Sequence, residues 1–190
     1  MTILEATILG IVQGFTEFLP ISSSGHLVLG QAILGIEQPG NEFEILVHVG
    51  TLASVLLIFF DDIKSLILSL ASKKTQIFIM YILIGTLPAV GIGLGFKDLI
   101  DSLFENVMAV GGALIFTGVV LFGSSFANRQ DKDHSFLTCI LIGCAQAMAI
   151  IPGVSRSGMT ISAALFLGLS AKEAARFSFL LAIPAIGGAG

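Results

Sequence analysis

The residues best suited to chemistry gather in one stretch of an otherwise apolar chain. Gln13 and Glu17 lie four residues apart, so on a helix their side chains point the same way. Three serines, Ser22–Ser24, follow within a few residues, and His26 comes two residues after the last of them. Ser23 and His26 are therefore candidates for nucleophilic or acid–base work beside the Glu17 carboxylate.

Gln13 and Glu17 are also the candidate metal ligands. A carboxylate and an amide oxygen can hold a hard divalent cation, Mg²⁺ or Ca²⁺, with water and substrate oxygens completing its shell. A carboxylate at membrane depth is costly and indicates function by default. The alternative is structural: Glu17 either reaches an interface or pairs with Arg156. His48 and Glu44 form another pair four residues apart, interpreted as an interfacial hydrogen bond.

A second polar cluster lies far along the chain, around Arg156. Serine is a preferred N-cap, so each serine run predicts the start of a helix. A helix N-terminus with free N–H groups also binds anions, and a guanidinium matches phosphate oxygens bidentately. The candidate anion-binding residues are Ser22, Ser24, Gly25, Ser155, Ser157 and Thr160. Together with Arg156 they predict a cage for a polyanion.

The two clusters belong to an internal repeat. A gapless shift of 133 positions pairs Gly10–Leu29 with Gly143–Ser162, and it matches Gln13 with Gln146. The serines at 22 and 24 and the glycine at 25 also fall on identical residues at 155, 157 and 158. Repeat one covers about residues 1–127 and repeat two about 134–190. A full second copy would need two more spans, so we expect the second repeat to be incomplete, that is, truncated at its C-terminal end.

Composition predicts a single polytopic membrane domain over residues 1–190. The chain is 55% hydrophobic and 12% charged, with a mean hydropathy of +0.98. Soluble domains carry roughly twice that charge. Ile77–Phe96 and Val107–Phe126 each contain 20 residues without a charge, enough to cross a bilayer as a helix. The expected fold is an all-α integral membrane protein, and the absence of a Lys/Arg cluster predicts no nucleic-acid partner.

Each repeat begins with two apolar arms around a polar break. The arms Ile3–Glu17 and Ser24–Ile36, and later Phe136–Ile151 and Gly158–Leu169, are too short to span comfortably. They predict re-entrant helical hairpins, whose turns must line a watery cavity or be buried in protein.

Three spans separate the hairpins, so the second should enter from the opposite face. The spans are Phe43–Phe60, Ile77–Phe96 and Val107–Phe126. Lysine and arginine mark the cytoplasmic loops, so Asp61–Gln76 and Asn128–Ser135 are assigned inside, and Glu37–Glu42 and Asp98–Glu105 outside. Inverted-topology repeats of this kind place a shared site near the bilayer midplane.

At these residues the chain resembles the bacterial undecaprenyl-diphosphate phosphatase family, the membrane phosphatases linked to bacitracin resistance. The resemblance rests on Gln13-x-x-x-Glu17, on Pro20–His26, and on the run from Pro152 to Thr160, PGVSRSGMT. It implies hydrolysis of undecaprenyl diphosphate, a phosphoric anhydride, to undecaprenyl phosphate and inorganic phosphate, which recycles the carrier lipid for peptidoglycan synthesis. It also implies dependence on Mg²⁺ or Ca²⁺ and an inner-membrane protein whose active site opens to the periplasm.

The residues leave several alternatives open. Ser23 or His26 could attack the terminal phosphorus, or His26 could activate a water, while Arg156 and the helix N-termini hold the diphosphate. A transporter or flippase for a phosphorylated lipid would share the inverted repeats and the polar midplane. The oligomeric state is also open, and a homodimer is one expectation.

Overall fold

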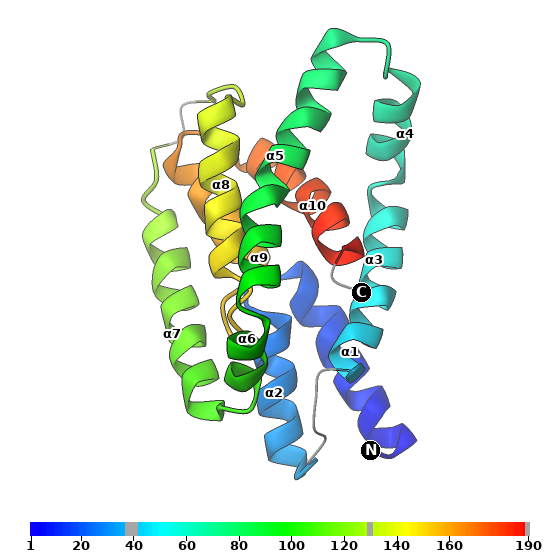
Figure 1. Ribbon diagram of the computed structural model, residues 1–190, viewed down its shortest axis with the longest axis vertical. Helices are drawn as coiled ribbons and strands as arrows, with labels where there is room; N and C mark the ends of the chain where they lie inside the picture. The colour runs from blue at the N-terminus through cyan, green and yellow to red at the C-terminus, as the bar shows by residue number, and fades with distance from the viewer. Residues whose placement is uncertain (37–41, 129–130, 189–190) are drawn as a thin grey trace.

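The protein is all-helical over the residues that its computed structural model describes, 1–36, 42–128 and 131–188 (Figure 1). The helices are α1 (Ile3–Phe18), α2 (Ser23–Leu34), α3 (Glu42–Ile58), α4 (Phe60–Leu68), α5 (Lys73–Gly95), α6 (Lys97–Phe104), α7 (Val107–Ser124), α8 (Phe136–Met148), α9 (Arg156–Phe166) and α10 (Ala171–Gly187). Most of the loop predicted at 37–42 lies outside the described residues, and Glu42 begins α3.

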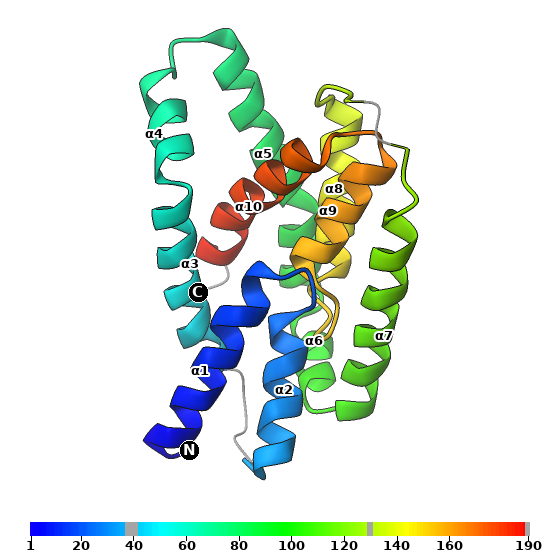
Figure 2. The same cartoon turned by 180° about the vertical axis from the view of Figure 1, so that it is seen from behind.

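Two helical hairpins approach each other end to end. In Figure 2, α1 and α2 rise from the lower end of the molecule, α8 and α9 descend from the upper end, and their connecting turns meet in the middle. α1 begins at Ile3 and α8 at Phe136, and α2 begins at Ser23 and α9 at Arg156. Both pairs of helix starts are 133 residues apart, which is the offset of the sequence repeat.

Within the described part of the chain, two helices, α5 and α7, are long and apolar enough to cross a membrane. α3 and α4 would make a third span if they are counted together, but they meet at a bend of 65° after Ile58. Exposed apolar side chains such as Leu83, Leu87 and Ile115 lie along α5 and α7, as lipid-facing surfaces require.

The predicted loops Asp61–Gln76 and Asp98–Glu105 were partly wrong. Residues 60–68 form α4, and residues 97–104 form α6. Asp61 and Asp62 lie in the first turn of α4, where the helix dipole favours negative charge. These charges make the composition of α4 resemble that of a loop, although its apolar residues allow it to form a helix.

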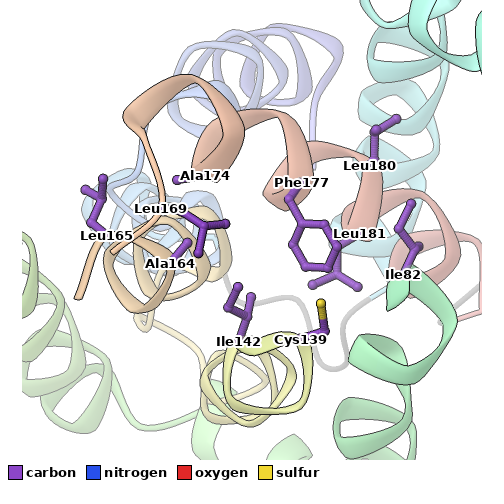
Figure 3. Packing of buried hydrophobic residues seen from close by; sticks show 10 residues of the cluster. All are labelled: Ile82, Cys139, Ile142, Ala164, Leu165, Leu169, Ala174, Phe177, Leu180 and Leu181. Carbon is purple, nitrogen blue, oxygen red and sulfur yellow. The ribbon is translucent and has the colours of Figure 1, made fainter. Parts of the chain in front are cut away.

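The buried apolar core lies where α8, α9 and α10 meet α5 (Figure 3). Its fully buried members include Phe177 and Leu181 from α10 and Ile142 from α8. α5 and α8 approach so closely that a Cβ added to Gly143 would collide with the backbone of Gly85. Small residues allow such backbone contact between helices in membranes. This contact fixes the end of α8 that leads into the central turn.

Candidate active site

The α1–α2 turn places three serines at the start of α2. The helix α1 ends at Phe18, two residues before Pro20, and Ser22 is the N-cap of α2. The Ser22 hydroxyl accepts a hydrogen bond of 3.3 Å from the backbone N–H of Gly25. Ser22 itself has φ of 68°, an uncommon conformation for a residue other than glycine. Strain of this kind clusters at functional sites, where the surrounding structure maintains it.

The α8–α9 turn is built on the same plan. Ser155 is the N-cap of α9, and its hydroxyl accepts a hydrogen bond of 3.0 Å from the N–H of Gly158. Thr117 on α7 secures this turn, because its hydroxyl donates to the Gly153 carbonyl and accepts from the Ser155 N–H, both at 3.1 Å. A helix outside both hairpins therefore holds the second turn in place.

Glycines let the two turns pack directly against each other. A Cβ on Gly25 would lie 2.9 Å from Gly153 Cα, and one on Gly158 would lie 2.8 Å from the backbone oxygen of Pro20. Residues 20 and 153, like 25 and 158, are 133 positions apart, so the contact is reciprocal. Ser157 adds a hydrogen bond of 3.5 Å from its hydroxyl to the Leu19 carbonyl. The backbone contact brings the N-termini of α2 and α9 together.

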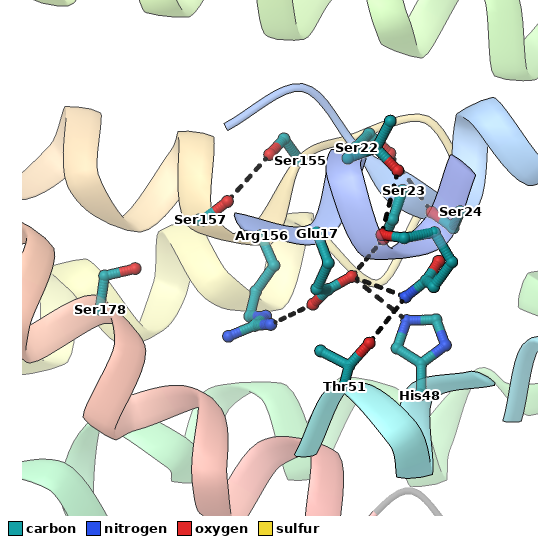
Figure 4. A network of polar contacts seen from close by, with 12 residues as sticks. Glu17, Ser22, Ser23, Ser24, His48, Thr51, Ser155, Arg156, Ser157 and Ser178 are labelled. Atoms are coloured by element: carbon teal, nitrogen blue, oxygen red, sulfur yellow. Dashed lines mark hydrogen bonds and ion pairs between the residues drawn. The ribbon is translucent and has the colours of Figure 1, made fainter. Parts of the chain in front are cut away.

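Glu17 is the centre of a polar network at this crossing (Figure 4). Its Oε1 lies 2.6 Å from Nη2 of Arg156 on α9. Its Oε2 accepts hydrogen bonds from the Ser23 hydroxyl and, at 3.0 Å, from Gln13 Nε2. His48 Nε2 on α3 lies 3.8 Å from the same oxygen. The pairing with Arg156, considered above as the structural alternative, is present.

The network lines a cavity of about 540 Å³. Its polar lining includes Glu17, Ser22, Ser23, Ser24, His48, Gln146, Ser155, Arg156 and Ser157. Its apolar lining comes largely from α5, α10 and the turn between α8 and α9. Arg156 is 17% exposed, and its Nη1 has no hydrogen-bond partner among the described residues. A cationic donor therefore remains available beside a carboxylate and several hydroxyls.

Four of the predicted site residues do not line the cavity. Gln13 is buried behind Glu17, where its Nε2 also donates to Thr51 at 3.2 Å. Gly25 serves the contact between the turns. The Thr160 hydroxyl bonds the Arg156 carbonyl at 2.8 Å, which steadies the first turn of α9.

The fourth is His26, whose ring faces its own turn. Its Nδ1 lies 2.7 Å from the carbonyl oxygen of Ser22, at the strained N-cap. This contact suits a residue that supports the turn.

Sequence reasoning missed His48 as a neighbour of Glu17. The hydrogen bond expected between His48 and Glu44 is present, but it uses the backbone carbonyl of Glu44 rather than its carboxylate. Glu44 accepts from Gln31 Nε2 at 2.9 Å, and His48 Nδ1 instead contacts the Glu44 backbone carbonyl at 2.5 Å. The spacing of four was visible, but nothing in the sequence reveals that this face of α3 turns toward α1.

The oxygen atoms of Glu17 and its neighbour Gln13 are of the chemical type that binds a hard divalent cation. Gln13 Oε1 is buried and has no hydrogen-bond partner among the described residues, and the Glu17 carboxylate is adjacent. Both are the oxygen ligands that Mg²⁺ and Ca²⁺ prefer. No group of three or more His, Cys, Asp or Glu residues that could hold a metal occurs in the described part of the chain. Any such ion would depend on substrate and water for the rest of its shell.

Comparison with known proteins identifies the family. Residues 6–190 match the family described as bacitracin resistance protein BacA. The chain is 47% identical to an undecaprenyl-diphosphatase of Carboxydothermus hydrogenoformans, in an alignment covering 100% of this chain and 72% of that protein. It is 45% identical to one of Halothermothrix orenii (100% and 74%) and 41% identical to one of Desulforapulum autotrophicum (100% and 76%). The chain therefore belongs to the BacA family.

Proposed function

We propose that this membrane protein hydrolyses undecaprenyl diphosphate to undecaprenyl phosphate and inorganic phosphate, which returns the carrier lipid to peptidoglycan synthesis. Relatives that align with the whole chain are named for this hydrolysis. The observation that carries the proposal is the direct contact of Arg156 and Ser23 with Glu17 in one cavity. The comparisons do not favour the transporter alternative.

Ser23 is the proposed nucleophile. Its hydroxyl already donates to Glu17 Oε2, so the carboxylate can take the proton as Ser23 Oγ attacks the terminal phosphorus. The bond between that phosphorus and the bridging oxygen breaks, and undecaprenyl phosphate leaves with the electron pair. Water then releases phosphate from the serine. His26 is less suited to either step, because its Nδ1 contacts the Ser22 carbonyl and its ring does not line the cavity.

Arg156 is proposed to hold the phosphoryl oxygens. Phosphoryl transfer depends mainly on positioning and on compensating negative charge. A guanidinium whose Nη1 has no partner among the described residues can provide both. The hydroxyls of Ser22, Ser24, Ser155 and Ser157 and the N-termini of α2 and α9 would bind the remaining oxygens. Mg²⁺ or Ca²⁺ held by Gln13 and Glu17 would neutralise further charge on the diphosphate.

Phosphate release from undecaprenyl diphosphate by the purified protein tests the function. Wild-type protein should release phosphate, and Arg156→Ala and Glu17→Ala should each lose at least about a hundredfold in kcat/KM. An acid quench during turnover should trap phosphate on wild-type protein but not on Ser23→Ala. Wild-type turnover in Arg156→Ala or Glu17→Ala would exclude this mechanism, and transport of the lipid without phosphate release would favour the rival.

We also propose that the two hairpins are inverted repeats in the bacterial inner membrane, with the cavity opening toward the periplasm. The helix starts 133 residues apart and the lysines of the α4–α5 region support this orientation. A membrane-impermeant thiol reagent tests it in intact cells, with both native cysteines replaced. Ser102→Cys should be labelled, whereas Lys64→Cys should be labelled only after permeabilisation, and the opposite pattern would reverse the orientation.

A further inference from the structure

Gln146, on α8, is a buried amide that the reaction as described does not use. Its side chain lines the cavity, yet the residue is only 2% exposed. Neither its Nε2 nor its Oε1 has a hydrogen-bond partner within residues 1–36, 42–128 and 131–188. An unpaired buried polar group is destabilising, and native proteins leave few of them without a reason.

The repeat explains why this amide lacks partners. Its counterpart Gln13 donates to Glu17 and to Thr51. A shift of 133 places Ile150 and Pro184 at the corresponding positions, and neither side chain can accept a hydrogen bond. Both of these residues line the same cavity as Gln146. In the second repeat the protein acceptors have therefore been replaced by apolar groups, while the amide has been kept.

We propose that Gln146 is a further substrate-contacting residue, whose amide N–H group donates to a non-bridging oxygen of the diphosphate. This inference rests on the proposed function. The diphosphate supplies several anionic acceptors, and Arg156 Nη1, the other donor in this cavity without a partner among the described residues, would bind the same group. Hydrogen bonds to a charged acceptor are the stronger class. The contact exists before and during the reaction, so it lowers KM more than it raises kcat.

Gln146→Met and Gln146→Glu test the inference through kinetics. Met keeps the length without the polar atoms, and Glu keeps the shape but replaces the donor with a negative charge. We expect KM for undecaprenyl diphosphate to rise roughly tenfold to a hundredfold in Gln146→Met, with kcat within about threefold of wild type. Gln146→Glu should raise KM at least as much, because its charge repels the substrate.

Thermal unfolding in detergent separates this role from a structural one. Without substrate, Gln146→Met should unfold at or above the wild-type temperature, because an unpaired buried amide has been removed. Inorganic diphosphate should raise the unfolding temperature of wild-type protein and have a smaller effect on Gln146→Met. The matched control is Ser162→Ala. It removes another buried polar atom that has no partner in the described part of the chain and that does not line the cavity. It should leave KM and the response to diphosphate unchanged.

An unchanged KM in both Gln146 variants would overturn the inference. A lowered unfolding temperature of Gln146→Met with a matching loss of kcat would also overturn it, because that result would indicate a structural role for Gln146. If wild-type protein releases no phosphate, the proposed function fails instead. The response to inorganic diphosphate would then decide whether Gln146 binds a phosphate group.

Discussion

Replacing Gly158 with alanine tests whether the active site depends on the close approach of the two turns. The new Cβ would lie 2.8 Å from the Pro20 carbonyl oxygen and 2.9 Å from Ser155 Cβ. The first of these atoms belongs to the backbone, so the turn itself must shift. Overpacking of this kind costs about 1–3 kcal/mol, and alanine recovers roughly 0.5–1 kcal/mol of helix propensity. The mid-range values of these two effects leave an expected net loss of stability of about 1 kcal/mol.

For a chain of this length that loss lowers the unfolding temperature by roughly 2–4 °C. Because Arg156 lies two residues from the substitution, kcat for phosphate release should also fall by about tenfold or more. Gly25→Ala should behave similarly, since its Cβ would meet Gly153 Cα at 2.9 Å. The matched control is Gly14→Ala on α1, where a Cβ meets nothing within 4 Å. It should retain activity and unfold at or above the wild-type temperature.

Thermal unfolding and phosphate release are measured on wild-type protein and the three glycine variants in the same detergent. Together they show whether the site depends on the close approach of the two turns. Wild-type stability and turnover in both Gly158→Ala and Gly25→Ala would refute the reasoning. Equal damage from Gly14→Ala would show that the effect is not specific to the turns.

Further predictions concern residues outside the network. Thr117→Val removes two buried hydrogen bonds to the α8–α9 turn. It should lower the free energy of unfolding by about 1–3 kcal/mol and lower kcat. A variant as stable and active as wild type would contradict the role of Thr117. Burial lowers the pKa of His134 below its ordinary 6.5 despite the nearby Glu173 carboxylate. The fold therefore favours neutral His134, and stability should be highest above pH 6.5 and fall as the pH drops below it. Melting curves at pH 7.5 and 5.5 test this, and His134→Gln should reduce the difference. Arg176→Gln breaks a partly exposed pair with Asp62 and should cost less than about 1 kcal/mol on the same measurement.

The helix boundaries at the two turns could be predicted because their signals are local. Pro20 and the serine N-caps predicted breaks that the structure has within about two residues, at the end of α1 and at the starts of α2 and α9. The proposed repeat was inferred from glycine, glutamine and serine identities at polar positions. α4 and α6 could not be predicted in this way, because several charged residues give a short helix the composition of a loop.

Residues brought to the site by other helices could not be predicted. His48 reaches Glu17 only because of the rotation of α3, and Thr117 reaches the second turn only because α7 packs against α9. The motif suggested a catalytic role for His26, which stays a prediction. The contact of its Nδ1 with the carbonyl oxygen of Ser22, a residue with φ of 68°, has no signal in the sequence.

The central claim is that Glu17 and Arg156, 139 residues apart in the chain, act as one unit on the diphosphate. A double-mutant cycle of Glu17→Gln and Arg156→Lys, read as kcat/KM for phosphate release, tests it most directly. We predict that each single variant loses at least about a hundredfold and that the double variant is hardly worse than the poorer single. Losses that multiply, as for independent residues, or near-wild-type turnover in either single variant, would contradict the claim.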